Sequence, residues 1–507
     1  MSAFDVRDLL KVAGAPGAAS AGYEAAPAAP PAETTYPARA AVSTVVLTGT
    51  VRLVEFALVV AVGAVVFSLQ PDRIGPFGLR YPVAILGTAC LVVGLFQASA
   101  TYRIAAFRGF FRTLPRLVGA WCLAFLLVAA IFVFAKVSDL YSRVWLAGFF
   151  AGGLGSILIA RFVLSRLVGA QMRAGRFDRR TAIVGGGPLA ETLIRSLEGQ
   201  ADIGIRVVGF FDDRADDRAS SVIAGYPKLG TVSDLVAYAR STRLDLVVFT
   251  LPIAAEERLM QMLTKLWVLP IDIRLSAQST RLKLRPRAYS YLGEVPVLDV
   301  FDKPIADWDV VVKGIFDRVV GTLMLIALAP LMLAIALAVR LTSPGPILFR
   351  QKRHGFNNEI IEVLKFRSMY VEQCDYTAAK QVTRGDPRVT PVGRIIRKTS
   401  LDELPQLFNV LKGELSLVGP RPHALSARAA NVLYDQVVDG YFARHKVKPG
   451  ITGWAQVRGW RGETDTDEKI QRRVEHDLYY IENWSVFFDI RIMLATPISL
   501  VRTRNAY

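Results

Sequence analysis

The sequence predicts a membrane protein that is α-helical in its N-terminal third and α/β in the remainder. Its 507 residues are 52% hydrophobic with a mean hydropathy of +0.33, which is more apolar than soluble domains usually are. Four apolar stretches before residue 170 each approach the ~20 residues that cross a bilayer. Beyond residue 180, strand-like runs alternate with helical patterns. We therefore expect a four-helix transmembrane bundle, a cytoplasmic α/β domain, and a C-terminal α/β domain on a re-entrant membrane helix.

The net charge limits the classes of partner. At +17 the surface is basic, which suits nucleic acid, anionic lipid headgroups or phosphorylated substrates. The long apolar segments favour membrane lipids, and we expect no nucleic-acid partner. The three cysteines and four histidines are scattered, without the close spacing of a disulfide framework or a zinc site. The sequence therefore gives no support to a histidine-based metal centre.

The N-terminal part divides into a tail and a membrane region. Residues 1–40 are rich in Ala and Pro, which predicts a disordered cytoplasmic tail. The region 41–170 holds the four apolar stretches, at 45–69, 82–100, 117–135 and 144–168. Arginines without acids follow the second stretch, and four arginines follow the fourth, so these two loops and the N-terminus should face the cytoplasm. In the first stretch, Arg52 and Glu55 are expected to pair with each other, the alternative being a functional polar spot.

The region 180–300 shows the pattern of a Rossmann-like domain. A buried strand, a glycine turn and a helix follow one another from Thr181, and further strands alternate with helices. Gly185, Gly187 and Ala190 satisfy the dinucleotide-binding pattern G-x-G-x-x-G/A. Gly185 and Gly187 are therefore weak candidates for cofactor binding, and the alternative is that they only form a tight turn.

A fifth apolar stretch opens the C-terminal region 310–507. It runs over 319–339 and is interrupted by Pro330. Basic residues flank it on both sides, so both ends prefer the cytoplasmic face. A re-entrant helix at about 315–341 that breaks at Pro330 satisfies both preferences, because proline removes a backbone donor and bends a helix. A kinked helix that crosses the membrane is the alternative.

Two adjacent carboxylates lie at the start of a predicted helix in this region. Ser400 is a plausible N-cap, and apolar residues at helical spacing follow it. Asp402 and Glu403 then fall in the first turn, where the helix dipole favours negative charge. Carboxylates there can bind Mg²⁺ or attack phosphorus. The alternative is a capping box between Ser400 and Glu403, which would serve helix stability alone.

Basic residues surround this pair of carboxylates. Arginine forks and lysines suit phosphate oxygens. Lys365, Arg397 and Arg421 are the main candidates for binding a substrate phosphate, and the other cations of the segment are Arg367, Arg384, Arg388, Arg394 and Lys398. The alternative is that these cations contact anionic lipid headgroups. That would explain the basic residues, but it would not explain the two carboxylates among them.

Four motifs in this region resemble the bacterial sugar transferase family, the polyprenyl-phosphate hexose-1-phosphate transferases. They are KFRSM at 365–369, SLDELPQLFNVLKG at 400–413, VGPRP at 418–422 and RHKVKPGITGWAQV at 444–457. The four spans and the Rossmann-like region resemble the large members of that family, so the likeness covers nearly the whole chain. The family has a Ser-Pro pair at its helix break, whereas this chain has Ala329 and Pro330.

The resemblance implies an enzyme of a bacterial cytoplasmic membrane with a cytoplasmic catalytic domain. It would transfer a sugar 1-phosphate from a UDP-sugar to undecaprenyl phosphate and release UMP, initiating exopolysaccharide or capsule synthesis with Mg²⁺ as cofactor. Asp402 would be the nucleophile and a metal ligand, with help from Glu403. Arg397, Arg421 and Lys365 would hold phosphates. Segments 459–464 and 477–484 look most like the glucose-transferring branch.

Other readings remain open at this point. The same reaction with galactose or another UDP-hexose differs by one hydroxyl orientation, which no single residue is seen to read. The glycine turn also suggests a membrane-tethered NAD-dependent sugar-nucleotide dehydratase or epimerase. Whether copies of the chain form a homo-oligomer is left open as well.

Overall fold

The computed structural model describes most of the chain. It divides into two compact units, Arg39–Asp178 and Arg179–Tyr507, and each is considered by itself. The predicted tail at 1–40 lies outside the described residues, which are 42–69, 79–200, 204–214, 221–251, 256–277, 290–293, 295–371, 386–423, 428–429, 432–433, 441–460 and 467–502.

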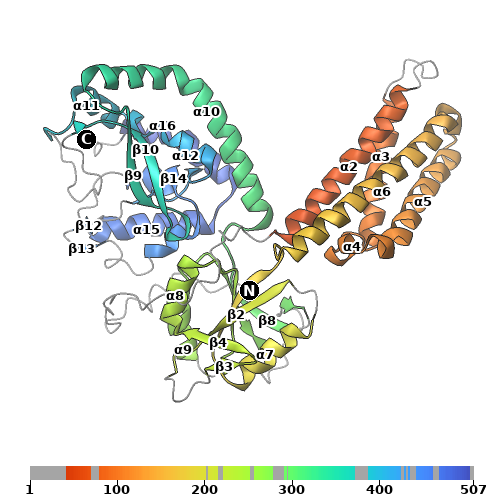
Figure 1. The fold of residues 1–507 in the computed structure, drawn as a ribbon. Helices are drawn as coiled ribbons and strands as arrows, with labels where there is room; N and C mark the ends of the chain where they lie inside the picture. Colours follow the sequence, from red (N-terminus) through yellow and green to blue (C-terminus); the bar gives the residue numbers. More distant parts are fainter. Residues whose placement is uncertain are drawn as a thin grey trace. The chain divides into compact units, whose positions relative to one another are not determined.

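Long apolar helices build the first unit (Figure 1). They are α2 (Thr44–Ser68), α3 (Arg80–Ala98), α5 (Phe110–Phe134) and α6 (Arg143–Arg173), connected in part by α4 (Ile104–Arg108) and η2 (Ser138–Leu140). α2 packs against α3 and α6, and α5 also packs against α3 and α6. Each of the four is long and apolar enough to cross a membrane. Trp121 and Phe149 are fully buried among them, while Leu126 and Ile159 are exposed on an apolar outer surface that suits lipid.

A buried polar network lies inside this unit, and it corrects the expected pairing of Arg52 with Glu55. Glu55 instead forms an ion pair with Arg161 of α6, with 2.5 Å between its Oε1 and the Arg161 Nε. Tyr102 donates a hydrogen bond to Glu55 at 2.8 Å, and Arg52 donates to Gln97 at 2.6 Å. Buried charges need close partners, and packing of α6 against α2 supplies one that spacing within α2 does not reveal.

A mixed eight-stranded sheet begins the second unit, and we call residues 179–301 the sheet domain. Its strand order is β3-β4-β2-β1-β5-β6-β8-β7. The strands are β1 (Arg179–Val184), β2 (Ile205–Phe211), β3 (Val222–Ile223), β4 (Tyr226–Gly230), β5 (Leu246–Phe249), β6 (Asp272–Ser276), β7 (Ser290–Leu292) and β8 (Val295–Phe301). β1 lies parallel between β2 and β5, and β8 closes antiparallel on β6. The helices are α7 (Pro188–Glu198), α8 (Val232–Ser241) and α9 (Glu256–Leu266).

The glycine turn between β1 and α7 needs its glycines. Gly185 and Gly187 have φ angles of +100° and +99°, which side chains rarely adopt. The buried Asp212 carboxylate accepts a hydrogen bond of 3.0 Å from the Gly186 amide. This bond helps to fix the turn between β1 and α7, and cofactor binding at Gly185 and Gly187 stays a prediction.

The C-terminal domain (residues 307–502) consists of the long helix α10 and a series of shorter helices and strands. They are α10 (Asp307–Thr342), β9 (Leu348–His354), η6 (Phe356–Asn358), β10 (Ile360–Phe366), α11 (Pro391–Lys398), η8 (Leu401–Glu403), α12 (Gln406–Lys412), β11 (Ser416–Val418), β12 (Arg428–Ala429), β13 (Val432–Leu433), η9 (Tyr441–Lys446), β14 (Gly450–Thr452), α14 (Trp454–Val457), α15 (Asp467–Glu482) and α16 (Val486–Arg502). Leu407, Val410, Val418 and Ile470 are buried at its centre. Burial of these apolar side chains joins α12, β11 and α15.

Helix α10 is bent, as Figure 1 shows, and it contains Pro330. Both ends are fixed to the same domain. Near the start, the Lys313 ammonium donates to Asp489 of α16 at 2.7 Å and to the Val418 carbonyl at 3.1 Å. Just beyond the end, Arg367 donates to the Ser343 carbonyl and hydroxyl, each at 2.6 Å. Ion pairs and hydrogen bonds thus hold the two ends of a 36-residue helix on one folded body.

Candidate active site

One face of the β9–β10 hairpin carries two of the cations of the site. Strands β9 and β10 pair antiparallel, with Arg353 opposite Ile361 and Gln351 opposite Val363. Residues two apart on a strand share a face. Arg353 and Lys365 therefore lie on the same face of the hairpin as Val363, which is buried.

The carboxylates lie on a 3₁₀ turn and not in a helix that starts at Ser400. Ser400 adopts a left-handed conformation with φ of 58°, and its side chain caps nothing. α11 has just ended at Lys398, and α12 begins only at Gln406, after Pro405. Both the expected N-cap and the alternative capping box are therefore wrong. A left-handed residue interrupts helical hydrogen bonding, so Asp402 and Glu403 occupy a short separate turn.

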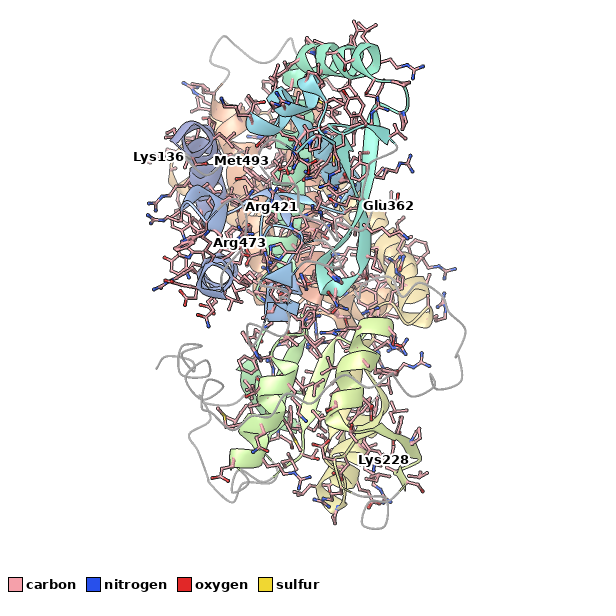
Figure 2. The ribbon with its side chains drawn as sticks, turned by 90° about the vertical axis from the view of Figure 1, so that its left-hand side faces the viewer. Lys136, Lys228, Glu362, Arg421, Arg473 and Met493 are labelled. Carbon is pink, nitrogen blue, oxygen red and sulfur yellow. The ribbon has the colours of Figure 1, made fainter. Side chains whose placement is uncertain are left out.

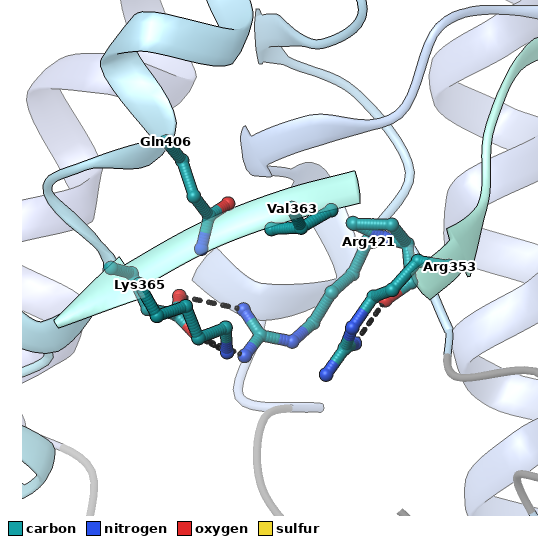
Figure 3. Close-up of a pocket in the computed structure, with 7 residues that line it drawn as sticks. Arg353, Val363, Lys365, Gln406 and Arg421 are labelled. Atoms are coloured by element: carbon teal, nitrogen blue, oxygen red, sulfur yellow. Dashed lines mark hydrogen bonds and ion pairs between the residues drawn. The ribbon is translucent and has the colours of Figure 1, made fainter. Parts of the chain in front are cut away.

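Glu403 is held by two cations. Lys365 donates to its Oε1 at 2.8 Å, and the Arg421 fork donates to Oε1 at 2.6 Å and to Oε2 at 3.1 Å. Figure 3 draws these contacts around the guanidinium of Arg421. Burial opposes ionisation of Glu403, but Arg421 and Lys365 outweigh it and hold the pKa of this carboxyl well below its usual range. Glu403 is thus a fixed anion that positions both cations.

Asp402 lies beside this cluster in a contrasting state. Its side chain is buried, and it makes no hydrogen bond or ion pair with any residue that the structure describes. Burial raises the pKa of Asp402 to about 6, while Lys365, Arg397 and Arg421 oppose the rise and Glu403 adds to it. At neutral pH it is an ionised, desolvated carboxylate whose oxygens are available for attack on an electrophile.

A small cavity lies next to these carboxylates, with about 180 Å³ of empty space that includes open solvent. Its lining consists of Arg353, Val363, Lys365, Glu403, Gln406, Arg421 and Pro422 (Figure 3). Burial lowers the pKa of Lys365 although Glu403 opposes this. Three cations face one carboxylate here, so the cavity is suited to an anion.

The other predicted cations separate into two groups. Arg397 is half-buried and approaches the Ser368 hydroxyl at 3.5 Å, and its charge acts on Asp402. Arg367, in contrast, is buried against Ser343 at the end of α10, and Arg388 forms an ion pair with Asp386 at 2.6 Å. Those two serve the fold and not a phosphate. Arg384 lies outside the described residues.

Three residues of the site escaped the sequence reasoning: Arg353, Arg444 and Asp477. Arg444 is fully buried and donates to the Arg421 carbonyl at 2.8 Å and to Asp477 at 2.6 Å. In Figure 2, Arg421 lies between the strand that carries Glu362 and the helices that carry Arg473 and Met493. Arg444 is the first residue of the 444–457 motif, and its place in that motif could have identified it as a residue of the site. Arg353 has no local signal, because only strand register brings it to the cavity.

The carboxylates of the site also determine how a metal ion could bind. Among the described residues there is no group of three or more His, Cys, Asp or Glu side chains arranged to hold an ion. Glu403 is fully engaged with cations, so Asp402 is the carboxylate with oxygens to spare. Mg²⁺ is commonly bound by one or two carboxylates together with substrate phosphates. Asp402 fits that mode, and no closed protein cage is needed.

Comparisons with known proteins bear on the family of the chain. A family model described as bacterial sugar transferase matches residues 308–503, and one described as CoA-binding domain matches 97–277. A UDP-glucose:undecaprenyl-phosphate glucose-1-phosphate transferase of Xanthomonas campestris pv. campestris is 35% identical over 90% of this chain and 94% of its own length. A protein of the same name from Escherichia coli (strain K12) is 38% identical over 76% and 81%. An undecaprenyl-phosphate galactose phosphotransferase of Salmonella typhimurium is 31% identical over 66% and 71%.

Proposed function

The chain belongs to the bacterial sugar transferase family, and we propose that it transfers glucose 1-phosphate from UDP-glucose to undecaprenyl phosphate, releasing UMP. The names of the relatives from X. campestris and E. coli state this donor and acceptor, and they align over most of both chains. The galactose relative is less similar and covers less of the chain, so it supports the galactose alternative less well. Sugar loaded onto a lipid carrier would initiate an exopolysaccharide or a capsule. A dehydratase or epimerase receives no support from these relatives.

The transfer takes place in two displacements. An Asp402 carboxylate oxygen attacks the β-phosphorus of UDP-glucose, and the bond from that phosphorus to the bridging oxygen breaks. UMP leaves with the electron pair, and glucose phosphate stays bound to Asp402 as an acyl phosphate. A phosphate oxygen of undecaprenyl phosphate then attacks the same phosphorus, and the bond to Asp402 breaks. Two steps let each bulky anion approach the phosphorus in turn.

The surrounding side chains lower the electrostatic barrier. Lys365 and Arg421, oriented by Glu403, would face the phosphate oxygens from one side, and Arg397 would act from the other. Mg²⁺, held by Asp402 and the donor phosphates, would offset charge on the diphosphate. With Arg353, four cations then stand against two carboxylates, a balance that suits a diphosphate.

One observation carries the assignment of the nucleophile. Of the two adjacent carboxylates, Glu403 has both oxygens bound by cations, whereas Asp402 is buried and has no partner within the described part of the chain. A nucleophile needs a lone pair that no other group occupies. Its attack is also favoured when its ionised form is destabilised by burial. Asp402 offers both, and Glu403 offers neither.

The membrane arrangement is also part of the proposal. The helices α2, α3, α5 and α6 would cross a bacterial cytoplasmic membrane as a four-helix bundle, with a Rossmann-like sheet domain and the C-terminal domain in the cytoplasm. α10 would enter the bilayer and leave on the same side. The support is that Lys313 and Ser343, close to its two ends, are both bound to the C-terminal domain.

The test is an assay of UMP release. Purified full-length protein with undecaprenyl phosphate, Mg²⁺ and UDP-glucose should release UMP, and a panel of UDP-hexoses should show the highest kcat/KM for UDP-glucose. Asp402→Asn should lose at least about 10³-fold in kcat, because the amide cannot form the acyl phosphate intermediate. After exposure to UDP-glucose alone, mass spectrometry should find a hexose phosphate on the peptide that contains Asp402. Wild-type turnover by the Asn variant would exclude this nucleophile.

A further inference from the structure

Gln406 presents its side-chain amide to the cavity, and the amide has no hydrogen-bond partner among the residues that the structure describes. Its side chain is 3% exposed, and it begins α12 four residues after Asp402. Figure 3 shows the amide pointing toward Lys365 and Arg421. Every other polar side chain that lines the cavity has an acceptor or donor among the described residues, but the Gln406 amide has none there. The amide atoms are not among the fully buried unpaired atoms of the described residues, so they reach the open space of the cavity and can bind an occupant there.

The cavity itself limits what the occupant is. Its empty space of about 180 Å³ includes open solvent, so charge and not size selects the group that binds there. Arg353, Lys365 and Arg421 line it and favour an anionic group of the donor. The oxygens of a phosphoryl group accept hydrogen bonds and donate none, so they would take the Nε2 hydrogens of Gln406.

We propose that the Gln406 amide donates a hydrogen bond to a non-bridging oxygen of the phosphoryl group that is transferred, and so acts as a substrate-binding residue of this site. This inference rests on the proposed function. Lys365 and Arg421 are already paired with Glu403, whereas Gln406 brings an unengaged donor without adding charge. A neutral donor stabilises charge that develops on the phosphoryl oxygens and does not hold the anionic product too tightly.

The experiment compares two inhibitors that differ by this phosphoryl group. UDP carries phosphorus at the transferred position, and UMP lacks it. In Gln406→Met, which keeps the length of the side chain and removes the donor, we expect kcat for UMP release to fall between about tenfold and a hundredfold. The inhibition constant of UDP should rise at least about fivefold, and that of UMP should stay within about twofold. Equal weakening of both inhibitors, or of neither, would overturn the proposal.

Two further variants keep the test decisive. Gln406→Glu has nearly the same shape and replaces the donor by an anion, so it should lose more activity than Gln406→Met, and wild-type kcat in Gln406→Glu would contradict the contact. Gln200→Met removes an amide from the sheet domain and should leave both inhibition constants unchanged. If wild-type protein releases no UMP from UDP-glucose, the proposed function fails. If it does and the Gln406 variants match it, only this inference fails.

Discussion

Two consecutive carboxylates with opposite surroundings define the site at the scale of single residues. Glu403 lies between Arg421 and Lys365, which hold the pKa of its carboxyl well below the usual range. Asp402 is buried without a hydrogen-bond partner among the described residues, and its pKa is raised to about 6. Environments that push neighbouring pKa values apart separate a reacting group from a supporting one. This difference supports the proposal that Asp402 attacks the phosphorus and that Glu403 orients the cations.

The raised pKa of Asp402 predicts a gain in stability when its charge is removed. The folded-state pKa, about 6, lies above the ordinary value of 3.8, so the folded state binds the proton more tightly. The stabilisation that protonation gives is full below pH 3.8 and is lost as pH rises through 6. Asp402→Asn should therefore raise the free energy of unfolding at pH 7 by up to about 3 kcal/mol while activity disappears. Thermal and denaturant unfolding of the purified protein would measure this change.

The pH dependence provides the control for that prediction. The advantage of Asp402→Asn should be constant above about pH 6.5 and should shrink as pH falls toward 4, because wild-type Asp402 then becomes neutral as well. A matched change at the exposed Glu359, Glu359→Gln, should show no such trend. An Asn variant that is less stable than wild type at pH 7 would mean that Asp402 is held by favourable contacts and is not a strained nucleophile.

The sequence allowed most residues of the site to be identified, but it did not reveal which of them contact one another. Asp402, Glu403, Lys365, Arg397 and Arg421 were selected from the motifs and charge pattern. In the structure Glu403, Lys365 and Arg421 line one cavity, and the charges of these three and of Arg397 act on Asp402. Which carboxylate is engaged by cations depends on side chains from β10 and from the turn after β11, and spacing within one segment does not reveal it. The same limit explains the wrong pairing of Arg52 with Glu55, whose true partner comes from another helix.

At the scale of elements, a buried strut supports the loop that carries Arg421. Arg444 of η9 binds the Arg421 carbonyl and is itself held by Asp477 of α15. Breaking a buried ion pair from one side leaves an uncompensated charge, at a cost of about 3–5 kcal/mol. Asp477→Asn should therefore lower both the free energy of unfolding and kcat, since Arg421 loses its backbone support. Denaturant unfolding and UMP release would quantify the two effects.

Two comparisons distinguish support of Arg421 during catalysis from a general contribution of the ion pair to stability. In the double variant Arg444→Met with Asp477→Leu, the ion pair is removed as a whole and not from one side, so much of the stability should recover while kcat stays low. Glu475→Gln breaks the exposed pair of Arg472 and Glu475 on the same helix and should cost less than about 1 kcal/mol with normal turnover. Full recovery of kcat in the double variant would show that the pair serves only folding.

Element boundaries also mark where sequence patterns stop being informative. Helical spacing from Ser400 onward predicted one capped helix, but the left-handed Ser400 and Pro405 divide the segment into a 3₁₀ turn and α12. Backbone conformation at one residue decides this, and tertiary packing selects it. Likewise Arg367 belongs to the KFRSM motif two residues after Lys365, yet β10 ends at Phe366. Beyond the strand, the Arg367 side chain binds Ser343 at the end of α10 and does not line the cavity.

At the scale of the whole molecule, the apolar segments and the basic excess were both read from the sequence. The structure has five helices, among the described residues, that are long and apolar enough to span a membrane. The relatives support a lipid-linked acceptor, which a membrane protein can meet at the bilayer surface. A basic site at that surface also gains from the negative potential of anionic lipids on the cytoplasmic side. The path of α10 therefore determines whether the site reaches its acceptor.

Re-entry of α10 predicts that both of its ends react from the cytoplasmic side. Its 36 residues would extend about 54 Å if straight, against ~30 Å for the hydrocarbon core. In a protein with Cys90, Cys122 and Cys374 replaced by serine, single cysteines at the exposed Asp309 and Thr342 should be labelled by an impermeant maleimide in inverted vesicles and not in intact spheroplasts. Lys136→Cys should show the reverse accessibility, because its loop is expected outside. Opposite labelling of Asp309→Cys and Thr342→Cys, in variants that still release UMP, would establish a crossing helix and refute re-entry.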